Sequence, residues 1–486
     1  NGTSGGYVGG LIGQYNPSQA ATIANVSASG DVSASGNRVG GLVGQASSSS
    51  NNQITVSDAH ASGAVNATNT GTYAYTGGLI GEFQNAGNVT DVSATGDVSS
   101  GAGYAGGLFG ELDHDSADYI VANASATGDV DATGQFVGGL IGYHEASRTI
   151  SNVTASGDVT STSGGEVGGL IGRWRLDYPR NNERHQMLNA SASGNISADS
   201  QYVGGLIGRV STKRYCVRVS DGFNGGGCDP DRSKVDDARI SDAHATGDVN
   251  TTYDEGGNAY VGGLIGRMDG ARQITNLSAS GEVTSASGDR VGGLIGNVNH
   301  ADGNYGITNA SATGNVSTTG QRVGGLIGYH QNGDRVETSY ARGDVSTDGD
   351  YVGGLIGDTN DGSITDSYAR GDVNSSGDYV GGLVGEANGD VTRAYASGRI
   401  EGGSSVGGIV GSNGGTLSDA YWDKGATNQS TATGSGTPPG ATGYGTVGDT
   451  RALEMQGRAP TQFMSALNYT SPWKLTSTYP IFQRES

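Results

Sequence analysis

The sequence is short of lysine, cysteine, proline and aromatic side chains. Its 486 residues include four lysines, two cysteines, eight prolines and three tryptophans. No apolar run approaches the roughly 18 residues that a membrane-spanning helix needs, so we expect no membrane span in this chain. Only 34% of the residues are hydrophobic. That share is too low for several large globular cores and favours a narrow core shared along an extended body.

Sequence motifs for catalysis are also missing. We find no nucleophile motif, phosphate-binding loop or cluster of metal ligands. The many carboxylates offer no pair that stands out as a general acid and base. We therefore expect no enzymatic activity and no required cofactor. A β-helical polysaccharide-degrading enzyme is the least favoured alternative.

Positive charge is scarce compared with negative charge. The chain has 36 Asp and 12 Glu against 23 Arg and four Lys, for a formal net charge of −21. Such a field repels nucleic acid and anionic membranes, so we expect no nucleic-acid partner. An Asp-rich, Lys-poor surface is typical of proteins from salt-loving organisms, where salt screens the self-repulsion. An ordinary acidic extracellular protein is the alternative. The chain begins at Asn1 without a secretion signal, which indicates a processed product or a piece of a longer chain.

Glycine, by contrast, is abundant, and many of the 90 glycines follow a repeat. A six-residue motif of the form VGGLIG starts at residues 8, 39, 76, 105, 137, 167, 203, 261, 291, 323, 352, 380 and 406. Neighbouring starts lie 26 to 58 residues apart, a spacing typical of solenoids, propellers or arrays. A propeller blade needs about 40 residues, and helical repeats need helix formers where this chain has Gly, Ser, Thr and Val. The period therefore predicts a β-solenoid with one coil per repeat.

A second half-motif follows each glycine motif, as in ISNVTASGDV at residues 150–159. Two of its columns are small or apolar and lie two residues apart, so they share the inward face of one strand. The neighbouring columns, mostly Asn or Asp and mostly Ser, Thr or Tyr, should then face outward. SGD or TGD turns the chain, because Gly and Asp tolerate a tight backbone.

These patterns predict an all-β fold, a β-solenoid or parallel β-helix with about 13 coils of about 30 residues over 1–420. Insertion loops are expected at 173–187 and 209–239. Residues 421–486 leave the repeat and should form a small C-terminal cap with a short helix near 450–467. The first coil has no such cap. Because an uncovered sheet edge pairs readily, we expect self-association end to end into a fibre.

The two half-motifs together resemble the GLUG repeat, which appears here as GGLIG followed by a TNASATG-like segment. The resemblance covers residues 8 to about 420. The end of the chain is similar to the tails of such proteins, with YWD at 421–423, LEMQ at 453–456 and YPIF at 479–482. GLUG repeats occur in large secreted or surface-attached proteins, including adhesin-like proteins and IgA1-cleaving metallopeptidases. The resemblance implies an extracellular, largely structural β-solenoid.

The same resemblance does not imply peptidase activity. The zinc motif of that peptidase family is HExxH, in which two histidines bind the metal. The only His-Glu pair here is His144-Glu145, and Arg148 stands where the second histidine would be.

The interruption at 173–239 differs from the rest of the chain in charge. It holds eleven Arg and Lys against eight Asp and Glu, in a chain that is acidic overall. Candidate contacts for an acidic neighbouring subunit or an acidic glycan are Arg173, Trp174, Arg175, Tyr178, Arg214 and Tyr215. A variable insertion without a binding role is the alternative. Cys216 and Cys228 lie twelve positions apart, which predicts a local disulfide and an oxidising compartment.

Two outward columns carry further candidates. Tyr340, Tyr368 and Tyr395 share one column and offer either a carbohydrate-stacking surface or a simple aromatic ladder. N-glycosylation candidates that share another column are Asn25, Asn123, Asn152, Asn189, Asn276 and Asn309. A ladder of Asn and Asp that shapes the backbone is the alternative for these six.

Stacked carboxylates raise the question of bound ions. Asp344 and Asp372 should lie in one column and repel each other unless salt or a cation screens them. The nonapeptide calcium-binding repeat is absent. Bound calcium or monovalent cations are therefore an option but not a requirement of the fold.

The glycine motif itself leaves one orientation open. Strict alternation would place Val323 and Ile327 on one face and Leu326 on the other. We expect the paired glycines to make a bend that turns both Leu326 and Ile327 inward. The alternative is an exposed leucine stripe along the rod, which would suit lateral contacts between rods.

The favoured function is an extracellular structural β-solenoid that builds a cell-surface filament or the stalk of an adhesin, assembling end to end or laterally. A glycan- or receptor-binding module that uses the Arg and aromatic loops is the second hypothesis. We expect a cell-surface location in a salt-adapted microorganism.

Overall fold

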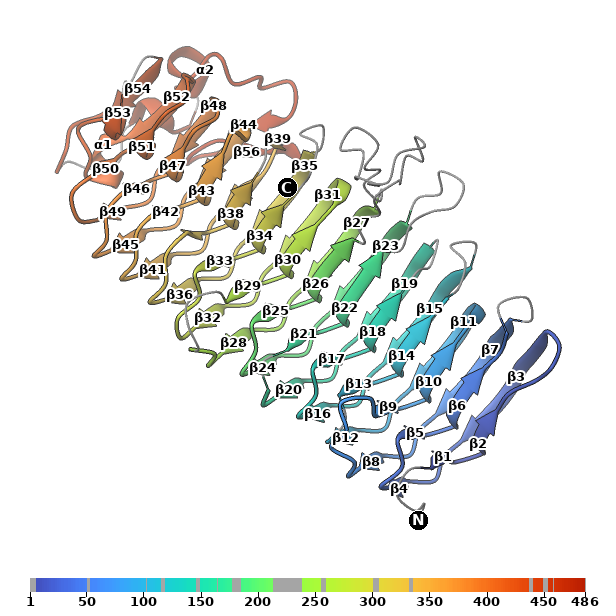
Figure 1. Ribbon diagram of the computed structural model, residues 1–486. Coiled ribbons are helices and arrows are strands. Elements are labelled where there is room, and N and C mark those ends of the chain that lie inside the picture. Colours follow the sequence, from blue (N-terminus) through green and yellow to red (C-terminus); the bar gives the residue numbers. More distant parts are fainter. Residues whose placement is uncertain are drawn as a thin grey trace, which may run out of the picture.

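The protein is a rod of stacked β-coils (Figure 1). The computed structural model describes residues 6–49, 53–101, 103–114, 119–145, 149–163, 165–176, 185–212, 238–254, 259–299, 306–331, 335–436, 440–448, 453–457 and 459–485. The coils advance steadily from one end to the other, and the C-terminal segments gather at the far end. This arrangement confirms the predicted all-β parallel solenoid.

One coil shows how each repeat folds. It consists of β37 (Val323–Gly324), β38 (Ile327–Gln331), β39 (Arg335–Glu337) with β40 (Tyr340–Ala341), and β41 (Val345–Thr347). Each strand pairs in parallel with its counterpart in the next coil, as Ile327 does with Ile356. Equivalent residues of successive repeats therefore lie directly over one another, because the register does not shift between most coils.

Four parallel sheets run along the rod, and we number them by their order within a coil. Sheet 1 has 13 strands, from β1 (Tyr7–Gly9) to β50 (Val406–Gly407). Sheet 2 has 14, from β2 (Ile12–Tyr15) to β53 (Thr433–Gly436). Sheet 3 has 15 on its main path, from β3 (Ala21–Ala28) to β54 (Ala441–Tyr444). Sheet 4 has 12, from β4 (Val32–Ala34) to β49 (Ile400–Glu401).

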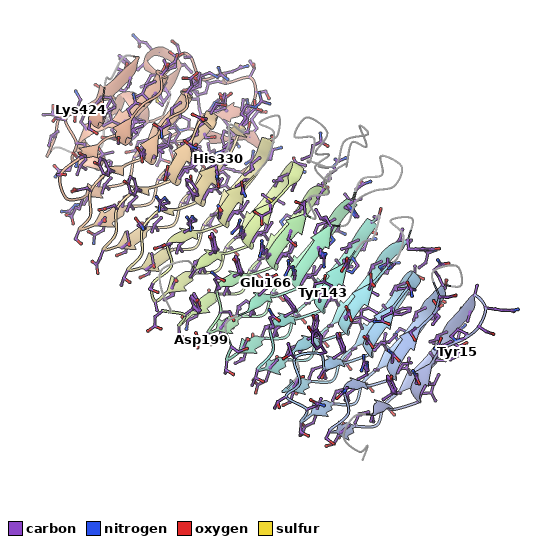
Figure 2. The ribbon with its side chains drawn as sticks, in the orientation of Figure 1. Tyr15, Tyr143, Glu166, Asp199, His330 and Lys424 are labelled. Atoms are coloured by element: carbon purple, nitrogen blue, oxygen red, sulfur yellow. The ribbon has the colours of Figure 1, made fainter. Side chains whose placement is uncertain are left out.

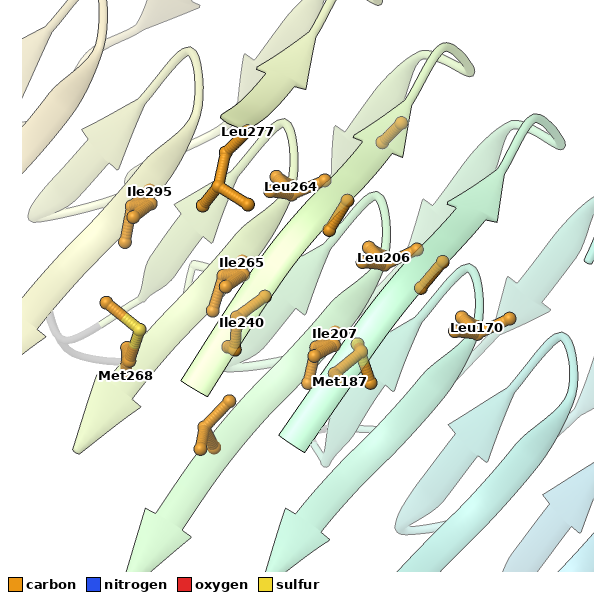
Figure 3. Close-up of a cluster of buried hydrophobic side chains, with 14 of the residues drawn as sticks. Leu170, Met187, Leu206, Ile207, Ile240, Leu264, Ile265, Met268, Leu277 and Ile295 are labelled. Atoms are coloured by element: carbon orange, nitrogen blue, oxygen red, sulfur yellow. The ribbon is translucent and has the colours of Figure 1, made fainter. Parts of the chain in front are cut away.

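Two separate hydrophobic cores run along the rod. The larger contains the Leu and Ile of the glycine motif with the inward columns of sheet 3, such as Leu326, Ile327 and Ala310. Figure 3 shows its middle, where Ile207 and Ile265 lie near Met187 and Ile240 of the facing strands. The smaller core contains the Val of sheets 1 and 4, such as Val323 and Val345. Both predicted inward columns of the second half-motif are buried from the second coil on, as expected.

The glycine motif is a sharp bend between sheets 1 and 2. Leu326 and Ile327 are both 0% exposed and share the larger core, whereas Val323 faces the smaller one. The predicted bend is therefore confirmed, and the exposed leucine stripe does not form. A Cβ on Gly324 would lie 2.1 Å from the Ile327 carbonyl oxygen, and one on Gly325 would lie 2.2 Å from that of Gly354. The backbones approach so closely that only glycine fits at either position.

The C-terminal segment extends two sheets and then folds back along the rod. The sheet extensions are β53 and β54, and the short helices are α1 (Lys424–Thr427) and α2 (Pro460–Phe463). Two 3-10 turns, Leu453–Met455 and Gln483–Glu485, and the antiparallel pair β55 (Trp473–Lys474) and β56 (Ile481–Phe482) complete it. A helix within 450–467 is confirmed. The tail covers the outer face of sheet 3 as well as the last coil (Figure 1).

Candidate functional site

The tyrosine column of sheet 3 is buried under the C-terminal tail. Tyr340 and Tyr368 stack with ring centroids 5.1 Å apart, and Tyr368 and Tyr395 with centroids 5.0 Å apart, each pair nearly parallel at 4°. Tyr368 and Tyr395 are 0% exposed because Trp473 and Phe482 lie against them. The predicted carbohydrate-stacking surface is therefore wrong for these two rings, and Tyr340 is only half-exposed. The column is an aromatic ladder on which the tail packs.

Polar contacts fix the tail to the same face. The indole of Trp473 donates to Asp366 at 3.1 Å, and the Tyr479 hydroxyl donates to Asp423 at 2.7 Å. Arg342 and Glu485 form an ion pair, and the Tyr395 hydroxyl donates to the Pro480 carbonyl. Burial is the main cause that raises the pKa of the Tyr395 hydroxyl far above its usual range. That hydroxyl is therefore a proton donor throughout the physiological pH range.

The asparagine column has a role in the backbone conformation of sheet 3. All six N-glycosylation candidates have positive φ, between 53° and 57°. Asn and Asp tolerate this left-handed conformation better than other non-glycine residues. Their side chains also form a ladder, in which Asn152 donates to Asn123 at 3.1 Å and Asn189 donates to Asn152 at 2.8 Å. The ladder alternative thus has direct support, and glycosylation of these residues stays a prediction.

The aspartate columns at the SGD turns use their carboxylates within the rod. The Asp372 backbone N–H donates to the Asp344 carboxylate at 2.8 Å, and the Arg399 N–H donates to Asp372 at 2.7 Å. Each such carboxylate therefore accepts a hydrogen bond from the next coil, which offsets part of the repulsion between neighbours. Within the described residues, no group of three or more His, Cys, Asp or Glu side chains is arranged to hold a metal ion.

The candidate contact residues of the 173–239 interruption differ in their exposure. Arg173, Trp174 and Arg175 lie in β22 (Ile171–Leu176) of sheet 2. Trp174 points into the larger core and is 0% exposed, so its prediction as a contact residue is wrong. Arg173 and Arg175 point outward and are partly exposed. Tyr178, Arg214, Tyr215 and the predicted disulfide of Cys216 and Cys228 lie outside the described residues.

The ends of β22 and β26 (Ile207–Thr212), which precede the two predicted insertions, lie side by side. The two strands are neighbours in sheet 2, and Leu176 pairs with Thr212 at their ends. The strands that precede the two predicted insertions therefore end at adjacent points. The strands run further than the predicted loop boundaries, since β22 reaches Leu176 and β26 reaches Thr212.

A row of polar and aromatic side chains between sheets 1 and 2 was missed at the level of sequence. It consists of the residue before each VG pair and the residue after each IG pair, and we name it the polar-aromatic ladder. Members before VG include Arg38, Tyr75, Tyr104, Phe136, Glu166, Tyr202, Tyr260, Arg290, Arg322 and Tyr351. Members after IG include Gln45, Glu82, Glu111, Tyr143, Arg173, Arg209, Arg267, Asn297, Tyr329 and Asp358.

The ladder joins neighbouring coils by ion pairs and ring contacts. Glu166 lies 3.4 Å from Arg173 and 3.5 Å from Arg209, and Figure 2 labels Glu166 and Tyr143 near the middle of the rod. The guanidinium of Arg209 stacks on Tyr202, with its carbon 4.9 Å from the ring centroid. These positions vary in residue type from coil to coil, so column alignment shows no conserved character. One signal in the sequence could have revealed the ladder. Polar and aromatic residues stand directly before the VG pair and directly after the IG pair in many repeats.

Near the N-terminal end, the ladder is rich in carboxylates. Arg38 pairs with Glu82 at 2.6 Å, and Gln45 also donates to Glu82. Glu111, in the next coil, has no ion-pair partner among the described residues. Burial, together with the negative charge of Glu82, raises the pKa of Glu111 to about 8. Glu111 is therefore protonated in the folded protein at neutral pH.

Replacing Glu111 with glutamine should flatten the pH dependence of stability. The folded pKa lies above the ordinary 4.5, so the unfolded chain loses this proton first as pH rises. Stability should fall between about pH 5 and pH 8 and stay low above that range. E111Q removes this loss and should raise the free energy of unfolding at pH 9 by about 2 kcal/mol. E401Q, at a half-exposed glutamate, is the control. Equal pH profiles of Tm for both variants would contradict the prediction.

Three segments match the family model described as "The GLUG motif", namely residues 72–99, 135–160 and 319–346. Each match contains one VGGLIG-type motif and the half-motif that follows it, and so spans the bend and both cores. The chain carries GLUG repeats. The described GLUG coils have no helix long and apolar enough to cross a membrane.

A relative of this GLUG-repeat chain is halomucin of Haloquadratum walsbyi (strain DSM 16790 / HBSQ001). The two are 59% identical over 421 residues, which cover 71% of this chain and 4% of halomucin. The chain thus spans a small part of the length of that relative. No solved structure matches the chain.

Proposed function

We propose that this chain is a structural segment of a large extracellular or cell-surface protein in a salt-adapted organism. The observation that carries the proposal is the continuous in-register stacking of the four sheets, which makes one long rod. Its net charge of −21 is compatible with high salt, where the repulsion along the rod is screened. The similarity to a segment of halomucin supports this class of protein.

We propose further that the rod lengthens end to end, as a filament or as the stalk of an adhesin. In the first coil, Leu11 is 55% exposed, whereas its counterpart Leu42 in the second coil is 0% exposed. Among the described residues, the strands β1 to β4 each have one sheet neighbour. Another coil, from the same chain or from a second copy, would bury Leu11 and satisfy this edge.

Negative-stain imaging of native material in high salt tests this proposal. Thirteen coils at about 4.8 Å per coil give a rod of about 60 Å. Rods or fibres several times longer are the expected result. Single short rods at high protein concentration, together with monodisperse behaviour in solution, would contradict end-to-end growth. A matched L11R variant, with a charge on the free edge, should shorten fibres that form between separate copies.

Glycosylation of the asparagine column would suit an extracellular rod. Asn25, Asn123, Asn152, Asn189 and Asn276 are exposed, and we expect mass spectrometry of the native protein to find glycans on some of them. Asn309 should be unmodified, because it is less exposed than the other five and the tail lies against it, with Arg484 donating to its side-chain oxygen at 2.8 Å. Glycan on Asn309 alone, or on none of the six, would contradict this prediction.

A second candidate function is binding of an acidic glycan or receptor through the two adjacent insertions. The observation in its favour is that β22 and β26, the strands that precede the two insertions, are neighbours, and that β22 carries the partly exposed Arg173 and Arg175. A glycan array separates the two functions, because a purely structural rod should bind no particular glycan on it.

A further inference from the structure

We propose that the polar-aromatic ladder contains an anion-binding site at Arg290 and Asn297, which takes a chloride ion or a carboxylate group. Arg290 lies in β33 (Arg290–Gly292) and Asn297 in β34 (Ile295–Asn299) of the same coil. The site does not depend on filament formation or on the insertions.

The first argument is a missing carboxylate. Three arginines occupy the ladder position before VG. Arg38 pairs with Glu82 at 2.6 Å and Arg322 pairs with Asp358 at 2.9 Å, and in both cases the acid follows IG in the next coil. For Arg290 the residue at that place is Tyr329. Within the described residues, Arg290 has no carboxylate within ion-pair distance. An anion from solution would supply the partner that the other two arginines receive from the chain.

The second argument is a pair of buried donors without acceptors. The Nη1 atom of Arg290 and the Nδ2 atom of Asn297 are both buried and lack a hydrogen-bond partner in the described part of the chain. Asn297 is 3% exposed, so its amide has almost no access to bulk water. A buried donor without an acceptor destabilises the folded state, and more so when it is charged. A bound acceptor would remove this cost at both groups.

The third argument is the geometry of the ladder. In other coils, the residue before VG contacts the residue after IG of the same coil. Examples are Glu166 with Arg173 at 3.4 Å and Tyr260 with the Arg267 guanidinium at 5.0 Å. Arg290 and Asn297 hold these two facing positions. Both donor groups therefore belong to one place in the ladder.

The surroundings favour a single negative charge. The Arg290 guanidinium lies between the rings of Tyr260 and Tyr329, at 5.0 and 5.4 Å from their centroids. Arg209 and Arg267 share Asp269, and Arg322 uses Asp358. Arg209 also pairs with Glu166, which it shares with Arg173. The five guanidinium groups of Arg173, Arg209, Arg267, Arg290 and Arg322 thus face three carboxylates, which leaves positive charge at this part of the ladder. A monovalent anion with hydrogen-bond acceptors, such as chloride or the carboxylate of a uronic acid, has the matching chemistry.

Thermal unfolding in different sodium salts at one fixed ionic strength tests the site. The salts are fluoride as reference, chloride, bromide, acetate and glucuronate, and Tm is measured as each replaces fluoride. An anion that binds only the folded rod raises Tm in a saturable manner. R290Q should abolish the saturable part of the rise, because the charged donor is lost. R399Q is the matched control, with the same charge change at an exposed ion pair outside the ladder.

A second variant supplies the anion covalently. Y329E places a carboxylate at the position that Glu82 and Asp358 occupy relative to their arginines. Its Tm should show no saturable rise with any of the four anions that replace fluoride. In the parent protein, N297A should weaken the apparent anion affinity about 10-fold or more, the effect of one hydrogen bond to a charged group.

The pattern of anions identifies the source of the ligand. A rise with chloride and bromide alone points to a halide, and bromide soaked into crystals should then give an anomalous peak beside Arg290. A rise with acetate and glucuronate points to a carboxylate of a glycan. The proposal is overturned if R290Q and R399Q respond to all salts as the parent does, or if bromide-soaked crystals show no density between Arg290 and Asn297 and no carboxylate raises Tm.

Discussion

Replacing Gly343 with alanine is expected to lower the free energy of unfolding by about 3 kcal/mol, the upper end of the range for overpacking. Gly343 lies in the RGD turn between sheets 3 and 4. A Cβ built on it would lie 1.9 Å from the Gly314 carbonyl oxygen of the preceding coil. Two successive turns would have to separate, and the N–H of Asp344 would then leave its acceptor on Asn315. The loss should appear as a lower Tm and as faster amide exchange in the adjacent coils.

Gly30 offers a matched control for that substitution. It occupies the same turn in the first described coil, where no earlier coil lies beneath it, and a Cβ there would meet nothing within 4 Å. G30A should therefore change stability by less than about 0.5 kcal/mol, the usual range for surface substitutions. If G30A and G343A destabilised the protein equally, the cost would arise from backbone flexibility in the turn and not from coil stacking. Both variants should be compared in the same high-salt buffer.

The fold was predictable because the repeats within the chain can be aligned with one another. A period near 30 residues with two inward columns, such as Val153 and Ala155, limits the chain to a parallel stack. The orientation of Leu326 was less certain, since it depends on a bend between two strands. The bend follows from the close approach of Gly324 and Gly325 to neighbouring backbone atoms. The glycines were visible in the sequence, but the atoms that exclude a side chain were not.

The candidate sites were harder to predict because they depend on contacts between distant segments. The alternation of side chains along the strand predicts that Tyr368 points outward from sheet 3, and it does. Trp473 and Phe482 of the tail nevertheless cover its ring. Nothing in the local sequence indicates that contact across more than 100 residues. Trp174 is a different case. It stacks in register between His144 and Val210, so aligning that column would have placed it in the core.

The polar-aromatic ladder was only partly predictable from the sequence. The residues that flank VGGLIG vary among Tyr, Arg, Glu and Asn, and variation of this kind is usually taken as a solvated surface. Arg38 and Glu82 are instead partners across two coils. The pairing rule, an arginine before VG with an acid after IG one repeat later, becomes apparent only once the coils are stacked. Its exception at Arg290 is the basis for the proposed anion site.

Replacing Trp473 with alanine should have the largest effect of all, a loss of about 3–5 kcal/mol in the stability of the C-terminal segment. Trp473 is 0% exposed and contacts Tyr368, Tyr395 and Phe482. Its removal leaves a cavity in the hydrophobic cluster that the tail forms with the tyrosine column, and leaves Asp366 without the indole donor. Because coils interact only with their neighbours, the loss should stay at this end of the rod.

Hydrogen exchange distinguishes this local loss from general unfolding. In W473A, amides of the tail and of β44 (Ser363–Ala369) and β48 (Val391–Ala396) should exchange faster, while those of the first five coils should not change. L453A is the control, since Leu453 belongs to the same segment but is 78% exposed. Reagents that modify exposed tyrosine side chains should reach Tyr368 and Tyr395 in W473A only. Uniform acceleration along the rod would mean that the C-terminal segment and the coils unfold as one unit, and the quasi-one-dimensional description would then be wrong.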